Sequence, residues 1–318
     1  MEIIGPSSPP LAPAGSVVTI GVYDGVHLGH QRTLRAVVEM AHASDRAAVV
    51  ATFDRHPASV LRPQAAPKLL ADLEQRLELL EQAGLDVTAV IPFDLQRARE
   101  TAEDFISGVL VDLLGASRVV VGEGFRFGAG RLGDTEVLAA QGRRLGFDIE
   151  TISLDMEEGE AVSSTRIRGE IAQGDVAGAS ALLGRCHELR GEVVHGDGRG
   201  GPLLGMPTAN IHVGEDMAVP ELGIYAGWYR DEEISAHPAA ISVGRRPTFY
   251  ADADPLIEAH LIGFSGDLYG RSGRISFLDR LRDEQRFDDL DELIAQMGAD
   301  VAHAARLLAD AAELAPGR

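Results

Sequence analysis

Strand-like and helix-like patterns alternate through the first half of this chain, and that alternation restricts its fold more than any other feature. Apolar runs predict buried strands at Val17–Val22, Ala47–Phe53, Val87–Phe93, Arg118–Val121 and Phe147–Leu154. Helical spacing predicts helices that start near Gly29 and that cover Leu69–Gly84, Thr101–Leu114 and Thr135–Leu145. This order is typical of an α/β protein with a doubly wound parallel sheet, whose ligands bind beyond the carboxyl ends of the strands.

The second half differs, because short β-like runs stand between Gly, Pro and Asp residues. The runs are Gly191–His195, Gly223–Tyr229, Ala239–Val243, Leu256–Ile262 and Arg274–Leu278. Their spacing predicts a small antiparallel β-barrel, and a helical pattern over Leu290–Leu308 predicts a terminal helix. A helical pattern over Ile171–Leu183 closes the first half, so we expect domains at residues 16–184 and 185–318. The Pro/Ser/Gly-rich residues 1–16 predict a flexible start.

The composition narrows the range of partners and compartments. The 318 residues include 29 basic and 49 acidic side chains, and the formal charge of −20 disfavours non-specific binding of nucleic acid or anionic membranes. Cys186 is the single cysteine, so no intrachain disulfide can form and a reducing compartment fits. The sequence has neither a signal-peptide pattern nor a long apolar segment. We therefore expect a soluble, cytoplasmic protein with no nucleic-acid or membrane partner. The sequence leaves open whether the protein forms a homo-oligomer.

The densest motif is Gly21–His30, G-V-Y-D-G-V-H-L-G-H, which joins the first predicted strand to the first helix and is called the histidine turn below. Its three glycines let a polyanion approach the backbone, and free N–H groups at a helix start attract phosphate. His27 and His30 are three residues apart, so both can face one side of the first helical turn and donate to phosphate oxygens. The alternative is an ordinary surface turn.

The histidine turn resembles the HxGH signature of the nucleotidyltransferase superfamily, and in particular its FAD synthetase branch. Three further segments resemble blocks of that branch: Thr52–Pro57 (T-F-D-R-H-P), Val121–Gly128 (V-G-E-G-F-R-F-G) and Ser163–Arg168 (S-S-T-R-I-R). The resemblance implies that a phosphate oxygen of FMN attacks the α-phosphorus of ATP and that pyrophosphate leaves. Positioning and charge neutralisation dominate catalysis of such a reaction.

This resemblance assigns roles to single residues, and it implies that His27, His30 and Arg166 are catalytic. The residues that it implies for binding ATP and its phosphates are Gly21, Tyr23, Asp24, Gly25, Gly29, Ser164, Thr165 and Arg168. The residues that it implies for binding the flavin are Phe53, Phe125, Arg126 and Phe127. The side chains by themselves leave simpler interpretations open: the phenylalanines can belong to the core, the arginines can be solvated, and the serines can cap a helix.

A second dense motif, Gly196–Asn210, contains a glycine-rich loop followed by P-T-A-N, and it resembles the riboflavin kinase block G-D-x-R-G-R-x-L-G-x-P-T-A-N. Such a loop can expose N–H groups to the phosphates of a second nucleotide. The residues implied for this contact are Gly196, Arg199, Gly200 and Gly205. Thr208 and Asn210 offer the neutral oxygen ligands that Mg²⁺ accepts. The alternative is a plain glycine-rich loop and turn.

Glu258 lies in the predicted strand Leu256–Ile262, on the same face as Leu256 and His260. The pattern leaves open whether this face is exposed or lies in the barrel mouth. The strand resembles the E-x-H strand of riboflavin kinases, which implies that Glu258 accepts the proton of the riboflavin 5′-hydroxyl as it attacks the γ-phosphate of ATP. A similar segment, L-R-D-E-Q-R-F, implies a flavin contact for Arg282.

Both motif sets occur in the right order and cover nearly the whole chain, residues 16–308. Together they resemble the prokaryotic bifunctional riboflavin kinase/FMN adenylyltransferase family. The resemblance implies two consecutive reactions, in which riboflavin and ATP give FMN, and FMN and ATP give FAD. It also implies Mg²⁺ for both steps, ATP as co-substrate, and no covalently bound cofactor.

Two departures from the family pattern define the rival interpretations. Gly124 stands where a side-chain amide or carboxylate is expected, and this puts adenylyl transfer in question. Gly201 and Pro202 stand where an arginine is usual, and this puts the kinase in question. The rivals are an enzyme with one working half, a non-catalytic flavin- or nucleotide-binding regulator, and a nucleotidyltransferase with another phosphate acceptor. The presence of both motif sets favours the bifunctional enzyme.

Overall fold

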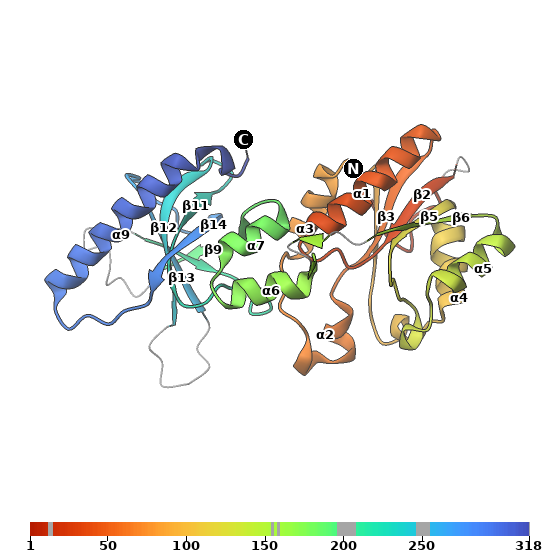
Figure 1. Ribbon diagram of the computed structural model, residues 1–318, viewed down its shortest axis with the longest axis horizontal. Coiled ribbons are helices and arrows are strands. Elements are labelled where there is room, and N and C mark those ends of the chain that lie inside the picture. Colours follow the sequence, from red (N-terminus) through yellow and green to blue (C-terminus); the bar gives the residue numbers. More distant parts are fainter. Residues whose placement is uncertain (12–14, 154–155, 158–159, 196–207, 246–254, 318) are drawn as a thin grey trace. The chain divides into compact units, whose positions relative to one another are not determined.

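A computed structural model describes residues 1–11, 15–153, 156–157, 160–195, 208–245 and 255–317. The chain divides into two compact units, Met1–Ser164 and Thr165–Arg318. In Figure 1 the first unit contains a sheet with helices around it, and the second contains a barrel with one long helix.

The first unit is organised around a parallel sheet of six strands in the order β1-β4-β3-β2-β5-β6. The strands are β1 (Glu2–Ile4), β2 (Ser16–Ile20), β3 (Ala47–Phe53), β4 (Val87–Ile91), β5 (Ala116–Gly122) and β6 (Asp148–Ile152). The order in which strands are added to the sheet reverses at β2: β3 and β4 lie on one side of this strand, and β5 and β6 lie on the other. The predicted α/β class with a doubly wound parallel sheet is confirmed.

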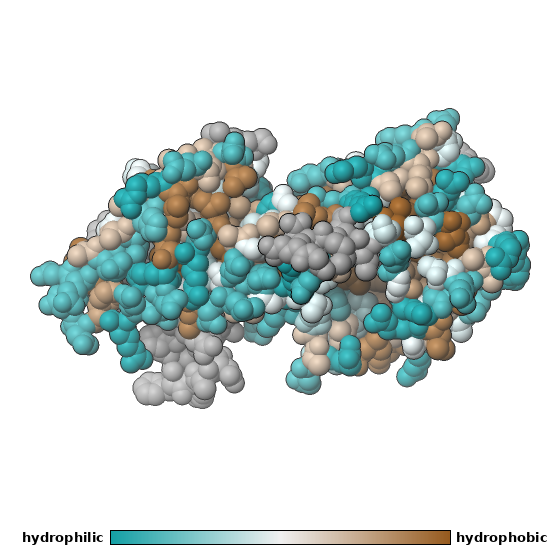
Figure 2. Space-filling view, in the orientation of Figure 1, coloured by the Kyte–Doolittle hydropathy of each residue, from teal (hydrophilic) through white to brown (hydrophobic). Residues whose placement is uncertain are grey.

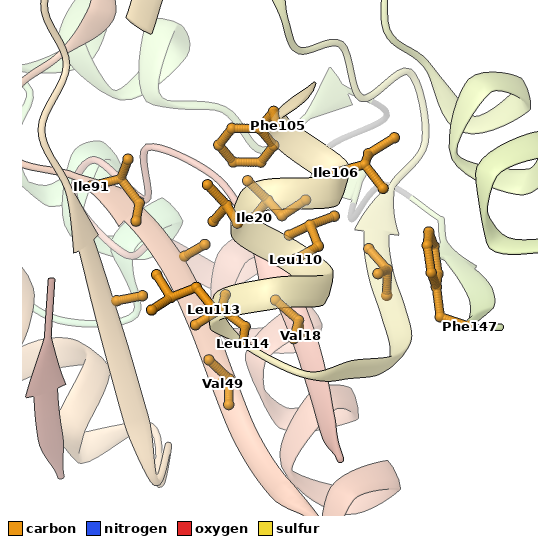
Figure 3. Close-up of a cluster of buried hydrophobic side chains, with 14 of the residues drawn as sticks. Val18, Ile20, Val49, Ile91, Phe105, Ile106, Leu110, Leu113, Leu114 and Phe147 are labelled. Atoms are coloured by element: carbon orange, nitrogen blue, oxygen red, sulfur yellow. The ribbon is translucent and has the colours of Figure 1, made fainter. Parts of the chain in front are cut away.

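Helices cover both faces of this sheet. They are α1 (Leu28–Ala43), α2 (Pro57–Leu61), α3 (Leu73–Gln82), α4 (Ala102–Phe105), a π-helix (Ile106–Leu113) and α5 (Thr135–Leu145), with 3₁₀ turns at Pro63–Ala65, Arg97–Arg99 and Ala129–Arg131. Side chains alternate along β2, so that Val17 packs with the residues of α1 and α3, while Val18 and Ile20 pack with Phe105 and Leu110 (Figure 3). Burial on both faces explains why the strands of this half read as continuous apolar runs.

The N-terminus and the start of α3 differ from the expectation. The sequence predicts a flexible start, but Glu2–Ile4 pair with β4 because Ile4 joins the buried core of the sheet. Helix α3 starts at Leu73, four residues later than predicted, because the side chain of Asp72 caps it by accepting a hydrogen bond from the Gln75 N–H at 2.9 Å.

The predicted helix Thr101–Leu114 also differs in its hydrogen-bond pattern. Thr101 caps it as expected, since its hydroxyl accepts from the Asp104 N–H at 3.1 Å. After Phe105 the α-helix continues as the π-helix. The Leu114 N–H donates to the Val109 carbonyl at 3.0 Å, a link of five residues rather than four.

The second unit contains a closed antiparallel barrel in the strand order β10-β13-β12-β11-β14-β9. The strands are β9 (His187–Val194), β10 (Ala209–His212), β11 (Gly223–Arg230), β12 (His237–Arg245), β13 (Pro255–Leu261) and β14 (Ser272–Asp283). Its largest buried side chains include Tyr225, Tyr229 and Phe277. The predicted barrel is confirmed, although no run predicts β10, a short strand that begins inside the P-T-A-N motif.

The terminal helix α9 (Leu290–Asp310) packs on the outside of the barrel, and a 3₁₀ turn (Ala312–Leu314) follows it. Ala304 and Leu308 of the helix contact Ala226 and Trp228 of β11 in one buried cluster. The outward side of α9 is mostly hydrophilic in Figure 2, as expected for a helix with one apolar face. The predicted terminal helix is therefore confirmed.

The predicted helix Ile171–Leu183 is instead two helices, α6 (Ser164–Ala172) and α7 (Val176–Leu183). They are separated by Gly174, whose φ of 78° is easy for glycine alone. Arg280 donates to the carbonyls of Gln173 at 3.5 Å and Leu222 at 2.6 Å, so the break is fixed to the barrel unit. A domain boundary near Arg185 stays a prediction.

A small antiparallel pair, β7 (Met156–Glu157) and β8 (Glu160–Ala161), precedes α6. Within the part of the chain that the structure describes, no helix combines the length and the apolar character that crossing a membrane requires.

Candidate active sites

The histidine turn lies where open α/β sheets bind their ligands. It follows β2, the strand at which the strand order changes direction. The neighbouring strand β3 ends at Phe53, and β5 leads into the segment Phe125–Phe127. The topology therefore brings three of the predicted motifs to the carboxyl edge of one sheet.

The backbone of the histidine turn has an unusual conformation. Tyr23 has a φ of 53°, Gly25 of 79° and Val26 of 41°. Positive φ is uncommon outside glycine, and for a β-branched residue such as Val26 it is an outlier. Each such residue costs about 1–3 kcal/mol and persists only where the surrounding structure determines it, which is most common at functional sites. Gly21 is required here, because the Tyr23 ring lies 2.9 Å from where a Cβ would stand.

Buried polar side chains hold this strained backbone. Oδ1 of Asp24, a residue that is 3% exposed, accepts hydrogen bonds from the backbone N–H groups of Leu70 at 2.9 Å and Ala71 at 3.2 Å. The Tyr23 hydroxyl lies 2.6 Å from Oγ1 of Thr19. Burial raises the pKa of Tyr23 more than this hydrogen bond lowers it, so the phenol stays protonated. Because these buried polar groups are hydrogen-bonded within the protein, they hold the turn in place without a ligand.

The two histidines stand side by side at the start of α1. Nδ1 of His27 accepts a hydrogen bond from the His30 N–H at 3.4 Å, and the two rings stack with centroids 3.6 Å apart. Burial, with a contribution from His27, lowers the pKa of His30 well below its usual value. No described residue bonds the buried Nδ1 of His30. Near neutral pH, His30 is therefore an uncharged ring with one nitrogen available to a ligand.

The segment Ser163–Arg168, called the serine-rich block below, contacts the histidine turn although it lies far along the chain. Oγ of Ser164 donates to the carbonyl of Asp24 at 3.0 Å, across a separation of 140 residues. The carbonyl oxygen of Val162 lies 3.6 Å from where a Cβ on Gly29 would stand, so the chain before Ser164 also packs against the histidine turn. Two motifs that the sequence could only pair by resemblance are in contact.

The other residues of the block continue into α6. Thr165 is exposed and Arg168 is half-buried. Nε of Arg166 lies 3.9 Å from the carboxylate of Glu170, one turn along the helix. Two arginines therefore follow directly after the serine that contacts the histidine turn.

The predicted flavin-binding phenylalanines are partly buried and packed against the core of the sheet. The rings of Phe125 and Phe127 stack with centroids 5.4 Å apart. Phe53 meets Phe93 edge to face at 5.3 Å. These rings therefore belong partly to the core, and their exposed parts lie at the carboxyl edge of the sheet.

The segment between β5 and α5 has one charged contact and one open position. Arg126 forms an ion pair with Asp134 at 2.6 Å, and the backbone hydrogen bond from Val137, with the charge of Arg126, lowers the pKa of Asp134. Gly124 has a φ of 72°, and no heavy atom of the described residues lies within 4 Å of where its Cβ would stand. The amide or carboxylate usual in the family would enter open space in a conformation that Asn and Asp tolerate.

The second candidate site lies on neighbouring strands of the barrel. Asn210 on β10 stands opposite Glu258 on β13, and Ser242 on β12 is the neighbour of Glu258 on its other side. These side chains share one face, and the buried Ile257 occupies the other. Ala240, two residues from Ser242, belongs to the cluster under α9, so this face is the outside of the barrel. Glu258 itself is half-buried.

Asn210 has the properties of a ligand residue. It is 4% exposed, and its Oδ1 has no hydrogen-bond partner among the described residues. Leaving a buried acceptor unpaired costs about 1–3 kcal/mol, so a bound cation would satisfy it. Thr208 directly precedes β10 and adds a second neutral oxygen. These residues fit Mg²⁺, which prefers oxygen ligands, while the described ranges contain no group of three His, Cys, Asp or Glu residues that could hold a metal.

Arg282 lies on β14, and Asp300 of α9 occupies its guanidinium. Its Nη2 donates to Asp300 Oδ2 at 2.7 Å and its Nε to Oδ1 at 3.0 Å. Gln296 donates to the same carboxylate at 2.9 Å. The pair fastens α9 to the barrel, and the flavin contact of Arg282 stays a prediction. The predicted phosphate-binding residues Gly196, Arg199, Gly200 and Gly205, with the departure at Gly201 and Pro202, lie outside the described residues.

Comparisons with known proteins cover both halves of the chain. A family model described as FAD synthetase matches residues 10–166, and one described as riboflavin kinase matches residues 183–308. The bifunctional riboflavin kinase/FMN adenylyltransferase of Escherichia coli K12 is 37% identical over 286 residues, which are 90% of each chain. The chain belongs to this family. The protein of the same name from Pseudomonas fluorescens is 36% identical over 298 residues, 94% of each chain.

A solved structure has the same two-part fold as this family member. It is a crystal structure of a protein from Streptococcus pneumoniae described as a macrolide-efflux protein, with a TM-score of 0.84 and 30% identity. The match covers 94% of this chain and 97% of that one. By its family, the chain is a transferase with an FAD synthetase half and a riboflavin kinase half.

One residue of the FAD synthetase half is absent from the sequence-based prediction of the site. Arg76 on α3 is 3% exposed and bonds backbone carbonyls at the carboxyl edge of the sheet. The available signal is its spacing, since Arg76 stands four residues before the buried Leu80, on the apolar side of an amphipathic helix.

Proposed function

We propose that the chain makes FMN from riboflavin and ATP in its barrel half, and FAD from FMN and a second ATP in its sheet half. The two catalytic domains are residues 16–184 and 185–318. Its ligands are the substrates riboflavin, FMN and ATP and the product FAD, and both reactions use Mg²⁺. The single thiol of Cys186 suits a reducing compartment, and we place the protein in the cytoplasm.

In adenylyl transfer, the histidine turn and the serine-rich block hold the phosphates of ATP while an FMN phosphate oxygen attacks the α-phosphorus. His27 and His30 donate hydrogen bonds to phosphate oxygens that gain charge in the transition state. The lowered pKa of His30 makes it a neutral donor, so positive charge comes from Arg166 and Arg168 and from the metal. No covalent intermediate is needed, because positioning and charge neutralisation carry this chemistry.

The remaining residues of this half bind the nucleotide and the flavin. Backbone N–H groups of the turn and the hydroxyls of Ser164 and Thr165 contact the departing pyrophosphate. The rings of Phe53, Phe125 and Phe127 offer flat surfaces to the isoalloxazine. Arg126 contributes its exposed side to the same ligand.

In the kinase half, Glu258 accepts the proton of the riboflavin 5′-hydroxyl as that oxygen attacks the γ-phosphorus of ATP. Thr208 and Asn210 hold Mg²⁺, which neutralises charge on the phosphates when it is bound. Asn210 and Glu258 occupy facing positions on β10 and β13, so the metal ligand and the base are presented on one face of the barrel. Arg282 is assigned to the flavin.

A single observation carries the proposal: residues assigned to one reaction, far apart in sequence, are brought together. Ser164 bonds the histidine turn across 140 residues. Asn210 pairs with Glu258 across the barrel sheet.

A time course with the purified protein, riboflavin, ATP and Mg²⁺ tests the proposal, with the flavins separated by chromatography. FMN should appear first and FAD later, and added FMN should give FAD without delay. FMN as the final product would mean that the sheet half, which contains Gly124, is inactive. FAD formed from FMN but not from riboflavin would mean that the barrel half is inactive. Tight flavin binding with no product would indicate the regulator.

A further inference from the structure

Arg76 is a charged side chain enclosed in the first unit. It lies on α3 and is 3% exposed. Burying a charge is costly unless hydrogen bonds and other charges compensate for it. Burial lowers the pKa of Arg76, and the carboxylates of Asp24, Asp54 and Asp72 oppose this effect. The contacts that Arg76 makes must therefore compensate for the cost of burying its charge.

Those contacts are two backbone carbonyls, one just beyond the end of β2 and one at the end of β3. Nη1 of Arg76 donates to the carbonyl of Val22 at 2.9 Å, and Nη2 donates to the carbonyl of Phe53. Val22 belongs to the histidine turn, and Phe53 is the last residue of β3. One rigid guanidinium therefore fixes the separation of β2 and β3 where the site begins.

The same stretch of chain holds the turn a second time. The backbone N–H groups of Leu70 and Ala71, just before α3, donate to Oδ1 of Asp24 at 2.9 and 3.2 Å. Residues 70–76 thus bond the turn on both sides of Tyr23, whose φ is 53°. A strained backbone persists only where its surroundings determine it, and these bonds hold the backbone that leads to His27 and His30.

We propose that Arg76 is a positioning residue of the adenylyl-transfer site, which keeps the histidine turn in its strained conformation through the carbonyls of Val22 and Phe53. The proposal rests on the proposed function, because it assumes that His27 and His30 act on ATP phosphates. Arg76 itself touches no reacting atom. Its effect is on the alignment of the histidines, where a small displacement lowers the rate without removing the binding site.

The test uses the full chain with Arg76→Met, Arg76→Lys and the control Arg35→Met, since Arg35 is an exposed arginine of α1. Lysine keeps the charge but lacks the fork that reaches two carbonyls at once. For FMN adenylylation, kcat should fall on the order of 10²-fold in Arg76→Met and about tenfold in Arg76→Lys, with KM for FMN unchanged. Riboflavin kinase activity of the same molecules should not change.

Two further measurements separate positioning from loss of structure. Circular dichroism establishes that each variant is folded at the assay temperature, and Arg76→Lys decides the case if Arg76→Met does not fold. Imidazole nitrogen resonances of His27 and His30 should shift in the Arg76 variants, while those of His187 in the barrel should not.

The outcomes are distinct. Wild-type kcat and unshifted imidazoles in a folded Arg76→Lys would overturn the inference. A loss of kcat that only follows the folded fraction would overturn it too. If the wild type makes no FAD from FMN, the proposed function fails, while the imidazole shifts still report whether Arg76 orients the histidines.

Discussion

The histidine turn and the Asn210–Glu258 strand pair present their side chains in contrasting ways. In the turn, Tyr23 and Val26 have positive φ, and groups from distant segments hold them in place. The strand pair lies in a continuous antiparallel register that includes β10, β13 and β12. Its backbone is ordinary, and the spacing of its side chains follows from the pleat alone.

The difference indicates which substitutions each site should tolerate. A site held by long-range hydrogen bonds depends on residues that never touch its ligand, and Arg76 is the example in the first unit. A site set by strand register depends mainly on its own side chains, because the ladder of hydrogen bonds survives most substitutions. The two activities of one polypeptide then serve as internal controls for each other.

The largest effect is expected for Glu258→Gln. The amide keeps the shape of the side chain but cannot accept the proton of the 5′-hydroxyl, and such a base contributes about 10²–10⁴-fold to a rate. FMN formation should fall by that factor, while FAD formation from added FMN stays normal. Initial rates of both reactions, measured on one preparation, check this expectation.

Glu192→Gln is the matched control, since Glu192 is an exposed residue of β9 in the same barrel and should change neither rate. Near-normal FMN formation by Glu258→Gln would remove the base assignment. It would also remove the contrast between the two sites, because the strand pair would then have no demonstrated chemical role.

His30→Ala should have the next largest effect, on the opposite reaction. Loss of one donor to developing negative charge costs on the order of 10²–10³ in kcat. FAD formation from FMN should fall by this factor, with riboflavin kinase unchanged. His42→Ala is the control on the same helix, where the side chain is 61% exposed. Equal FAD yields from the two variants would place His30 outside the site.

The parallel sheet, the barrel and the terminal helix could all be predicted from periodicity, because burial on one or both faces leaves a regular apolar pattern. Glu258 could be assigned to the polar face of its strand for the same reason. Its partner across the sheet could not, since β10 (Ala209–His212) is a short strand that begins within a motif interpreted as a loop and turn. Cross-strand neighbours follow from tertiary register, which no local pattern contains.

The first site shows the same limit in another form. His27 and His30 are visible in sequence, because their spacing and the nearby glycines are local features. The contacts of Arg76 with Val22 and Phe53 are not, since hydrogen bonds to backbone carbonyls leave no trace in the identity of the acceptor residues. The π-helix after Phe105 was equally hidden, because helical spacing of apolar residues does not distinguish four-residue from five-residue links.

A third prediction contrasts His30 with a second buried histidine, His187 of β9. His187 is 1% exposed and its Nε2 lies 2.8 Å from the Ala218 carbonyl, whereas Nδ1 of His30 has no hydrogen-bond partner among the described residues. Burial lowers the pKa of His187 from 6.5 to about 4. Above pH 6.5 the lowered pKa of His187 does not change the free energy of unfolding. Below pH 6.5 the unfolded chain binds a proton at this residue that the folded chain does not bind, so stability falls.

The fall should be about 1.4 kcal/mol per pH unit, and it should total about 3 kcal/mol by pH 4. Urea unfolding of the barrel at pH 7.5 and 5.5 measures the first part of this range. His187→Asn should lose this component of the pH dependence, while His212→Asn, on the exposed end of β10, should keep it. Identical pH dependence in His187→Asn and wild type would show that this ring titrates normally in the folded protein.

The smallest effect is expected for Gly124→Asn, which tests whether the first site extends beyond the histidine turn. The new side chain would stand in open space at a φ of 72°, a conformation that asparagine tolerates. It restores the side chain usual in the family, so kcat for FAD formation should rise a few-fold with stability nearly unchanged. Gly146→Asn is the matched control, because Gly146 has a φ of 86°, equally open surroundings and a place at the end of α5. A rise in Gly124→Asn alone would mean that the β5 edge contributes to the reaction. Equal rates in both variants would mean that the histidine turn and the serine-rich block suffice, and the dependence of this site on long-range contacts would then be confined to the residues that hold the turn.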